Sequence, residues 1–240
     1  MARTRTIALA LAAAGGIAGS AWWLQRSSAP APRLRDPARI DAVLRPAVPI
    51  VRAPFVADRS VVAAGCPLPV QAVSPDVPAQ TLPPARMPAF VQAGGRLQPL
   101  AGFGVDARVL SVRAYDDDRE AEFAPIDIAL GWGRMRDDDV LRGIEVNQQG
   151  RWYYTRWRDA PEIPIAQLRR ESANMHMIPA NHAIATALAG IEKDQRIRID
   201  GWLVEVQARD GWRWRSSTRR DDHGPGGCEV VYVCGVAIAR

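Results

Sequence analysis

The stretch 179-PANHAIATALAGIEKDQRIRIDGWLVEVQA-208 contains a helix signal followed directly by a strand signal. Asn181 is a good N-cap residue, the residues after it are rich in alanine and apolar, and Gly190 can end the helix. Beyond a short polar turn, Ile197 and Ile199 alternate with charged residues, and another apolar run follows. Because alternation with period two is typical of strands, this stretch predicts one helix that leads into a β-rich region.

Strand signals also lie before and after this stretch. Residues 108–115 alternate, residues 123–133 form an apolar segment that ends in glycines, and 144-IEVNQQGRWYYTRW-157 predicts a hairpin with its turn at residues 148–150. A last strand is expected over residues 229–238. The order of three strands, a helix and two or three strands predicts a mainly β domain with one helix (α+β). A small OB-like or SH3-like β-barrel has this order, and an irregular α+β sheet is the alternative.

The N-terminal residues 1–26 form either a transmembrane anchor or a secretory signal. Two arginines precede an uncharged apolar run, residues 7–24, which is long enough to span a bilayer. Gly19 and Ala21 offer small residues for signal cleavage, but two tryptophans follow them directly, so we favour an uncleaved anchor. Either interpretation exports the rest of the chain. We therefore expect a single-pass protein of the bacterial inner membrane with its C-terminal domain in the periplasm.

Prolines concentrate between the anchor and the β-rich region. Residues 27–94 include runs such as "APAPRLRDPAR" and "SPDVPAQTLPPARMP", and proline disfavours helix at its own position and at the preceding residue. This segment is predicted to be a partly extended tether, and residues 95–240 the globular domain. Apolar residues between positions 48 and 63 leave open that part of the tether lies against the domain.

The composition is that of a folded protein without a concentrated basic surface. Hydrophobic residues make up 48% and charged residues 24% of the chain, which permits a sizeable core. The net charge is +5, yet acidic and basic residues alternate in "YDDDRE", "RMRDDDVLR" and "TRRDDH". Because a phosphate backbone is bound by clustered basic residues, nucleic acid is not expected as a partner.

The glycine-rich segment "DDHGPGGCEVV", residues 221–231, supplies the candidate catalytic residues Cys228 and His223. A cysteine nucleophile needs a nearby imidazole to form thiolate at neutral pH. The segment resembles the "SHGC" signature of the L,D-transpeptidases, which form peptidoglycan crosslinks. It departs from that signature because the histidine stands five positions before the cysteine, and Glu229 and Val230 replace an apolar residue and an arginine. The alternative, which we favour, is a small core residue at the start of a strand.

The three cysteines allow one disulfide. In one unbroken strand Cys228 and Cys234 would lie about 20 Å apart, at ~3.3 Å per residue, which is too far for a bond. A bond from Cys66 to either of them would attach the tether to the domain.

Binding residues are expected in three places. "SANMHM" before the helix offers a polar edge, "GWRWR" places two tryptophans on one face of a strand with arginines opposite, and the segment after it is charged. The alternatives are capping of loop backbone for the first and core packing for the second. The histidines lack metal-site spacing and no CxxC accompanies them, so neither a metal nor another cofactor is expected. The candidate binding residues are Asn174, His176, Trp212, Trp214, Arg219 and Asp221.

Four blocks, "IDIALGWGRM", "SANMHMIPA", "GWLVEV" and "SSTRRDDHGPGGCEVVYV", resemble a group of uncharacterised bacterial membrane-anchored envelope proteins. The resemblance covers about residues 103–233 and implies no activity. We expect a non-enzymatic periplasmic domain that serves as a binding or accessory module for an envelope protein or glycan. The alternative is a cysteine-dependent cell-wall peptide hydrolase or transpeptidase that uses Cys228 and His223.

Overall fold

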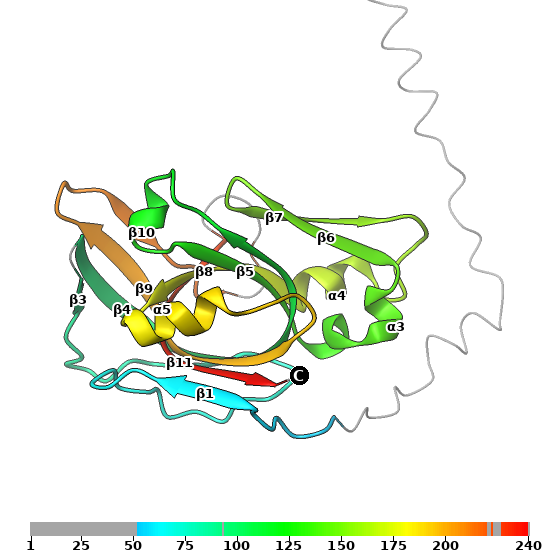
Figure 1. Ribbon diagram of the computed structural model, residues 1–240, viewed down its shortest axis with the longest axis horizontal. Helices are drawn as coiled ribbons and strands as arrows, with labels where there is room; N and C mark the ends of the chain where they lie inside the picture. The colour runs from blue at the N-terminus through cyan, green and yellow to red at the C-terminus, as the bar shows by residue number, and fades with distance from the viewer. Residues whose placement is uncertain (1–51, 93, 220–221, 223–226, 240) are drawn as a thin grey trace, which may run out of the picture. The chain divides into compact units, whose positions relative to one another are not determined.

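A computed structural model describes residues 52–92, 94–219, 222 and 227–239. These residues belong to one compact unit that begins at Arg52 (Figure 1). The predicted anchor, residues 1–26, and the first part of the predicted tether lie outside the described residues. None of the helices in the described ranges combines the length and the apolar character needed to cross a bilayer.

The described domain is mainly β with few helices, as predicted. Its strands are β1 (Arg59–Val62), β2 (Ala79–Thr81), β3 (Phe90–Gln92), β4 (Gly95–Ala114), β5 (Ile126–Gly131), β6 (Ile144–Gln149), β7 (Trp152–Trp157), β8 (Ser172–Pro179), β9 (Arg196–Ala208), β10 (Arg213–Arg215) and β11 (Glu229–Ala239). Its helices are α3 (Asp138–Leu141), α4 (Ile165–Arg170) and α5 (His182–Ala189), with 3₁₀ turns η1 (Glu120–Glu122) and η2 (Gly133–Arg136).

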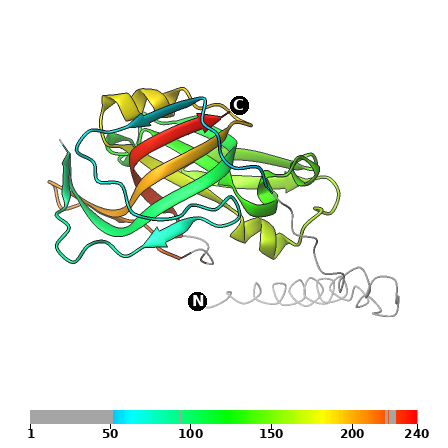
Figure 2. The ribbon, with the colours of Figure 1, turned by 90° about the horizontal axis from the view of Figure 1, so that it is seen from below.

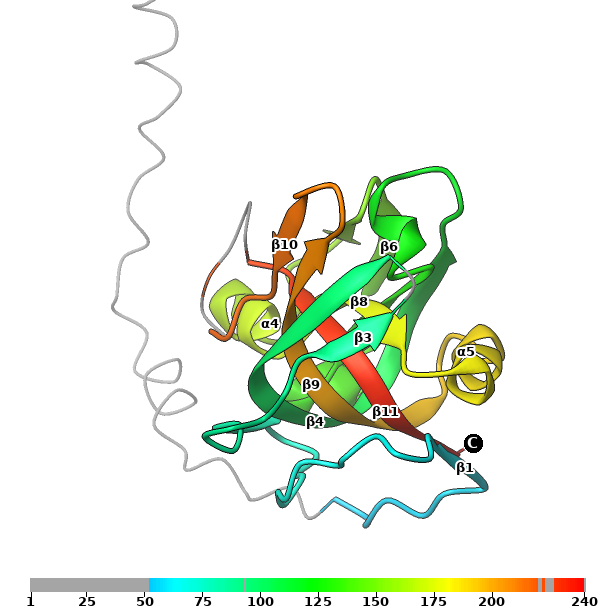
Figure 3. The same cartoon turned by 90° about the vertical axis from the view of Figure 1, so that its left-hand side faces the viewer.

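Five strands form a closed circuit of pairings. β4 pairs with β5 and β9, β5 pairs with β8, and β11 pairs with both β8 and β9. β8 and β11 are parallel, whereas the other pairs in the circuit are antiparallel. A parallel pair needs a long connection, which here includes α5 and β9. Figures 2 and 3 show β11 lying between β1 and β9.

The predicted helix is present as α5 and packs on the main core. The Asn181 side chain accepts a hydrogen bond from the backbone N–H of Ile184 at 3.0 Å, as an N-cap residue does. Ile184 and Leu188 are fully buried in the main core, which also contains alternate residues of β4 such as Phe103 and Val105. The helix itself contacts β1, β8 and β11. Because α5 has one apolar face and the strands alternate, the helix and the strands share the main core.

β4 begins earlier than its sequence pattern predicts. The alternation marks a strand only from about residue 108, because Pro99 and several glycines precede it. The pairing of β4 with β9 shifts between Pro99 and Ala101, and proline is tolerated at such a bulge. A Cβ built on Gly102 would lie 2.7 Å from Pro69 Cβ, so glycine lets another segment pack against this strand.

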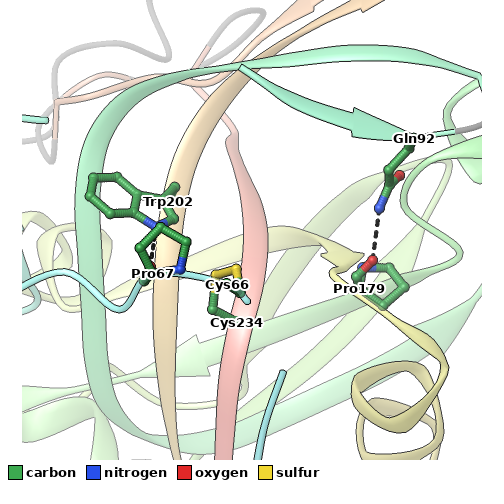
Figure 4. The surroundings of a disulfide bond; sticks show 6 residues. All are labelled: Cys66, Pro67, Gln92, Pro179, Trp202 and Cys234. Carbon is green, nitrogen blue, oxygen red and sulfur yellow. Dashed lines mark hydrogen bonds between the residues drawn. A yellow bond between two sulfur atoms is a disulfide. The ribbon is translucent and has the colours of Figure 1, made fainter. Parts of the chain in front are cut away.

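That segment is residues 52–92, which the sequence assigned to the tether. β1 pairs with β11, and β2 and β3 pair with β4. A disulfide joins Cys66 to Cys234, whose Cα atoms are 5.5 Å apart (Figure 4). Trp202 Nε1 donates a hydrogen bond to the carbonyl of Pro67 at 2.7 Å. The segment therefore lies against the domain, which the apolar residues between positions 48 and 63 had left as a possibility. It is attached there by one of the two disulfides from Cys66 that the cysteine spacing allowed.

Candidate functional site

The hairpin β6–β7 covers one part of the outer surface of the sheet. It lies near α3 and α4 (Figure 1), and a small core beneath it contains Leu110, Ala129 and Leu168 with Tyr153 of β7 packed against them. The hairpin was predicted, but its turn lies at Gly150 and Arg151 instead of residues 148–150. Both turn residues have positive φ, 56° and 68°, as a two-residue hairpin turn requires.

Arg151 attaches the tip of this hairpin to the domain. Its Nη1 donates to Asp127 Oδ1 at 2.8 Å and to the carbonyl of Ala124 at 2.9 Å. Its Nε and Nη2 donate to the two carboxylate oxygens of Asp118 at 2.7 and 2.6 Å, and these bonds lower the pKa of Asp118. The guanidinium carbon lies 3.8 Å from the centre of the Tyr115 ring. All three guanidinium nitrogens are thus occupied within the protein.

Asp127 is fully buried and collects hydrogen bonds from β8 as well. His176 Nδ1 lies 2.8 Å from Asp127 Oδ1, and Asn174 Nδ2 donates to Asp127 Oδ2 at 3.2 Å. Asn174 also donates to the Arg151 carbonyl at 3.0 Å and accepts from Gln148 Nε2 at 2.6 Å. A buried carboxylate is stable only when it is paired in this way. The structure therefore brings the predicted residues Asn174 and His176 together, around a residue that the sequence analysis missed.

A pocket of about 360 Å³ opens beside this network. Trp152, Tyr153 and Trp132 contribute aromatic side chains, and Tyr153 Oη lies 3.0 Å from Ser172 Oγ. Burial raises the pKa of Tyr153, so its hydroxyl stays protonated at neutral pH. The lining residues are Trp132, Arg151, Trp152, Tyr153, Thr155, Leu168, Arg169, Ser172, Ala173, Asn174, Asp222, Gly227, Cys228 and Glu229.

Trp212 and Trp214 are half-buried and do not line the pocket. The centres of their rings are 5.8 Å apart, and Trp214 lies 4.8 Å from the His176 ring while Trp212 lies 6.1 Å from the Phe123 ring. The intervening Arg213 binds Glu205 at 3.0 Å. These contacts are the packing that the sequence analysis gave as the alternative to ligand binding.

Cys228 lines the pocket but is a weak nucleophile there. Burial, together with the neighbouring carboxylates of Glu229 and Asp127, raises the pKa of its thiol to about 12. A reactive cysteine needs a pKa well below that of a free thiol, so Cys228 is a neutral thiol at pH 7.

Three further predicted residues lie in or next to the segment before β11. The backbone N–H of Arg219 donates to Ser217 Oγ at 2.9 Å. His223 and Asp221 lie outside the described residues. In the described ranges, no group of three His, Cys, Asp or Glu side chains is arranged to hold a metal ion.

No family model, no curated protein and no solved structure matches this chain. The candidate site is therefore defined by the geometry of Asp127, Arg151, Trp152 and Tyr153 together with the predicted Asn174. One of these had a signal in the sequence, because Asp127 is the single charged residue in the apolar run "FAPIDIALGWG". The other three read only as ordinary residues of a hairpin.

Proposed function

We propose that this protein is a membrane-anchored periplasmic binding module that holds an envelope glycan in the pocket beneath the β6–β7 hairpin. The observation that carries the proposal is the composition of the pocket wall. Trp152 and Tyr153 supply aromatic surfaces, and the side chain of Thr155 supplies a hydroxyl group. The Asn174 amide, which donates to Asp127 and to the Arg151 carbonyl, holds the wall behind them in place. Concave sites with aromatic walls and a few well-placed polar groups are typical of small-ligand binding.

The arrangement of strands supports an OB-type barrel as the architecture. The circuit runs β4–β5–β8–β11–β9, the pair β8–β11 is parallel, and α5 connects β8 to β9. Five-stranded OB barrels bind oligosaccharides or oligonucleotides on their second and third strands and the adjoining loops. The second and third strands of this circuit are β5 and β8, which carry Asp127 and Asn174. The likeness of fold adds support by analogy only.

The charges of the pocket favour a glycan over a nucleic acid. Arg151 and Arg169 line the pocket together with the acidic residues Asp222 and Glu229, whereas a phosphate backbone needs an excess of positive charge. The high pKa of Cys228 favours binding over cysteine chemistry. The apolar residues 7–24 support a location at the inner membrane, with the domain in the periplasm.

The test is a calorimetric titration of the full-length chain in mild detergent with chitooligosaccharides, which share the N-acetylglucosamine chemistry of the cell wall. Trp152→Ala is expected to weaken binding ~10-fold, or about 1.4 kcal/mol, because it removes a stacking surface. Trp157→Ala is the matched control, since Trp157 lies on the same strand, is 36% exposed against 39% for Trp152, and stands outside this pocket.

Two results would overturn the proposal. One is the absence of saccharide binding by the native protein. The other is equal affinity in the Trp152→Ala and native proteins. Recovery of an envelope protein whose binding depends on Trp152 would replace the glycan by a protein ligand.

A further inference from the structure

The outward face of the β6–β7 hairpin differs sharply from its inward face. Gln148, Tyr153 and Thr155 are buried or half-buried beneath the hairpin. The outward residues are all exposed and form three cross-strand pairs: Gln149 with Trp152, Asn147 with Tyr154, and Glu145 with Arg156. Core packing explains the inward residues but not the exposed aromatic ones.

Two aromatic side chains on this face are each opposite an amide. Trp152 is 39% and Tyr154 49% exposed. Among the described residues, neither ring stacks on another ring, and no hydrogen bond engages the side chain of Asn147 or Gln149. An amide side chain has two N–H donors and a carbonyl acceptor. The face therefore keeps its aromatic surface and its hydrogen-bonding groups available.

The chemistry of the face fits a neutral sugar chain. The apolar side of a sugar ring stacks on an aromatic ring, and sugar hydroxyls can hydrogen-bond to amide groups. The only charges on the face, Glu145 and Arg156, are opposite in sign and directly opposite in register. A single-stranded nucleic acid also stacks on aromatic rings, but it requires a basic groove along its backbone. The balanced charge of this face does not supply one.

The outward face meets the pocket at Trp152. Trp152 contributes to the pocket wall and also to the outward face. Tyr154 follows two residues later on the same side of β7, about 7 Å along the strand at ~3.3 Å per residue. Arg151 attaches the adjacent turn to Asp118 and Asp127. Because the hairpin is held in place before a ligand arrives, little ordering entropy is lost on binding.

We infer that the outward face of β6–β7 is a second subsite for a linear, uncharged oligosaccharide. One end of the oligosaccharide occupies the pocket, and its next units lie along β7 over Trp152 and Tyr154. This inference rests on the proposed function and specifies its ligand as a chain longer than the pocket holds.

The experiment compares chitobiose with chitohexaose by calorimetry on the full-length chain. Tyr154→Ala is expected to weaken chitohexaose ~10-fold and to leave chitobiose within about twofold, because only the longer ligand reaches Tyr154. Tyr154→Phe keeps the ring and is expected to bind both ligands like the native protein. Trp157→Ala, an exposed aromatic residue of β7 outside the cross-strand pairs of this face, is expected to change neither affinity.

Failure of the inference and failure of the proposed function give different results. If the native protein binds both ligands equally and Tyr154→Ala changes neither affinity, the second subsite is wrong while the pocket stands. If the native protein binds neither ligand, both proposals are wrong. If Tyr154→Ala weakens an oligonucleotide or a protein and no saccharide, the inferred ligand class is wrong.

Discussion

Arg151 shows how one side chain holds a site in place. It sits in a turn with φ of 68°, a backbone region that non-glycine residues rarely adopt. The cost is offset by its hydrogen bonds to Asp118 and to the fully buried Asp127. A buried carboxylate that loses its cationic partner is strongly destabilising.

Arg151→Gln is accordingly expected to lower the free energy of unfolding by ~3–5 kcal/mol, because Asp127 loses the cation that compensates it. Arg156→Gln, which removes an exposed arginine from the same hairpin, is expected to change the free energy of unfolding by less than ~0.5 kcal/mol. Urea unfolding of both variants measures the difference. Equal losses of stability in the two variants would mean that the network around Asp127 stabilises the protein no more than an exposed arginine does.

Cys228 is expected to resist alkylation in the native protein. Its pKa of about 12 leaves almost no thiolate at pH 7, and reactivity should rise only as the pH approaches that value. Iodoacetamide labelling at a series of pH values, read by peptide mass spectrometry, measures this. Cys66 and Cys234 should label only after reduction. Rapid labelling of Cys228 in the native protein, with a midpoint of the pH dependence below ~8.5, would instead support a cysteine-dependent enzyme.

Among the elements, β4 depends on small residues along its length. Gly102 and Gly104 face the segment that carries Pro69 and Val73, and a Cβ on either glycine would come within 2.7 Å of a carbon atom there. Added volume at a tight contact must displace one of the two partners. The glycines therefore allow the N-terminal segment to lie flat against the strand.

Gly102→Ala is expected to destabilise the domain by ~1–3 kcal/mol and to increase protease cleavage between residues 67 and 81. Gly143→Ala is the control, because no atom lies within 4 Å of its added Cβ and its φ is not positive. Denaturant unfolding and limited proteolysis measure the two effects. A Gly102→Ala protein that keeps both its stability and its protease resistance would contradict the close-packing argument.

For the molecule as a whole, the disulfide joins residues 168 positions apart and attaches the N-terminal segment to the central strand β11. Such a bond restricts the unfolded chain, and its removal typically costs ~2–5 kcal/mol. Reductant is therefore expected to lower the urea midpoint of the native protein. Cys228→Ala, which keeps the bond, should show the same drop, whereas Cys66→Ala should be insensitive to reductant. An unchanged native midpoint after complete reduction would contradict this role.

Local signals in the sequence predicted several parts of this molecule correctly. The cap at Asn181 and the apolar face that follows predicted α5, alternation predicted β9 and the later part of β4, and the spacing of the cysteines left a bond from Cys66 open. The strand directly before α5, β8, was not predicted. The cap and the alternation depend on residues only a few positions apart, and the cysteine argument depends only on how far one extended strand can span. The early part of β4 was missed because Pro99 and the glycines disfavour a strand locally, whereas pairing with β9 compensates for them.

The candidate site was decided by the tertiary structure. Arg151 and Trp152 stand next to each other in the chain and both line the pocket, yet Arg151 turns inward to the buried Asp127 whereas Trp152 is exposed. The packing of the hairpin on the domain decides this difference. Asp127 and His176 are 49 positions apart and meet through the pairing of β5 with β8. Composition and periodicity predicted α5 and several of the strands, because these signals depend on residues close together in the chain. The site arose from contacts between distant residues, which depend on how the strands pair.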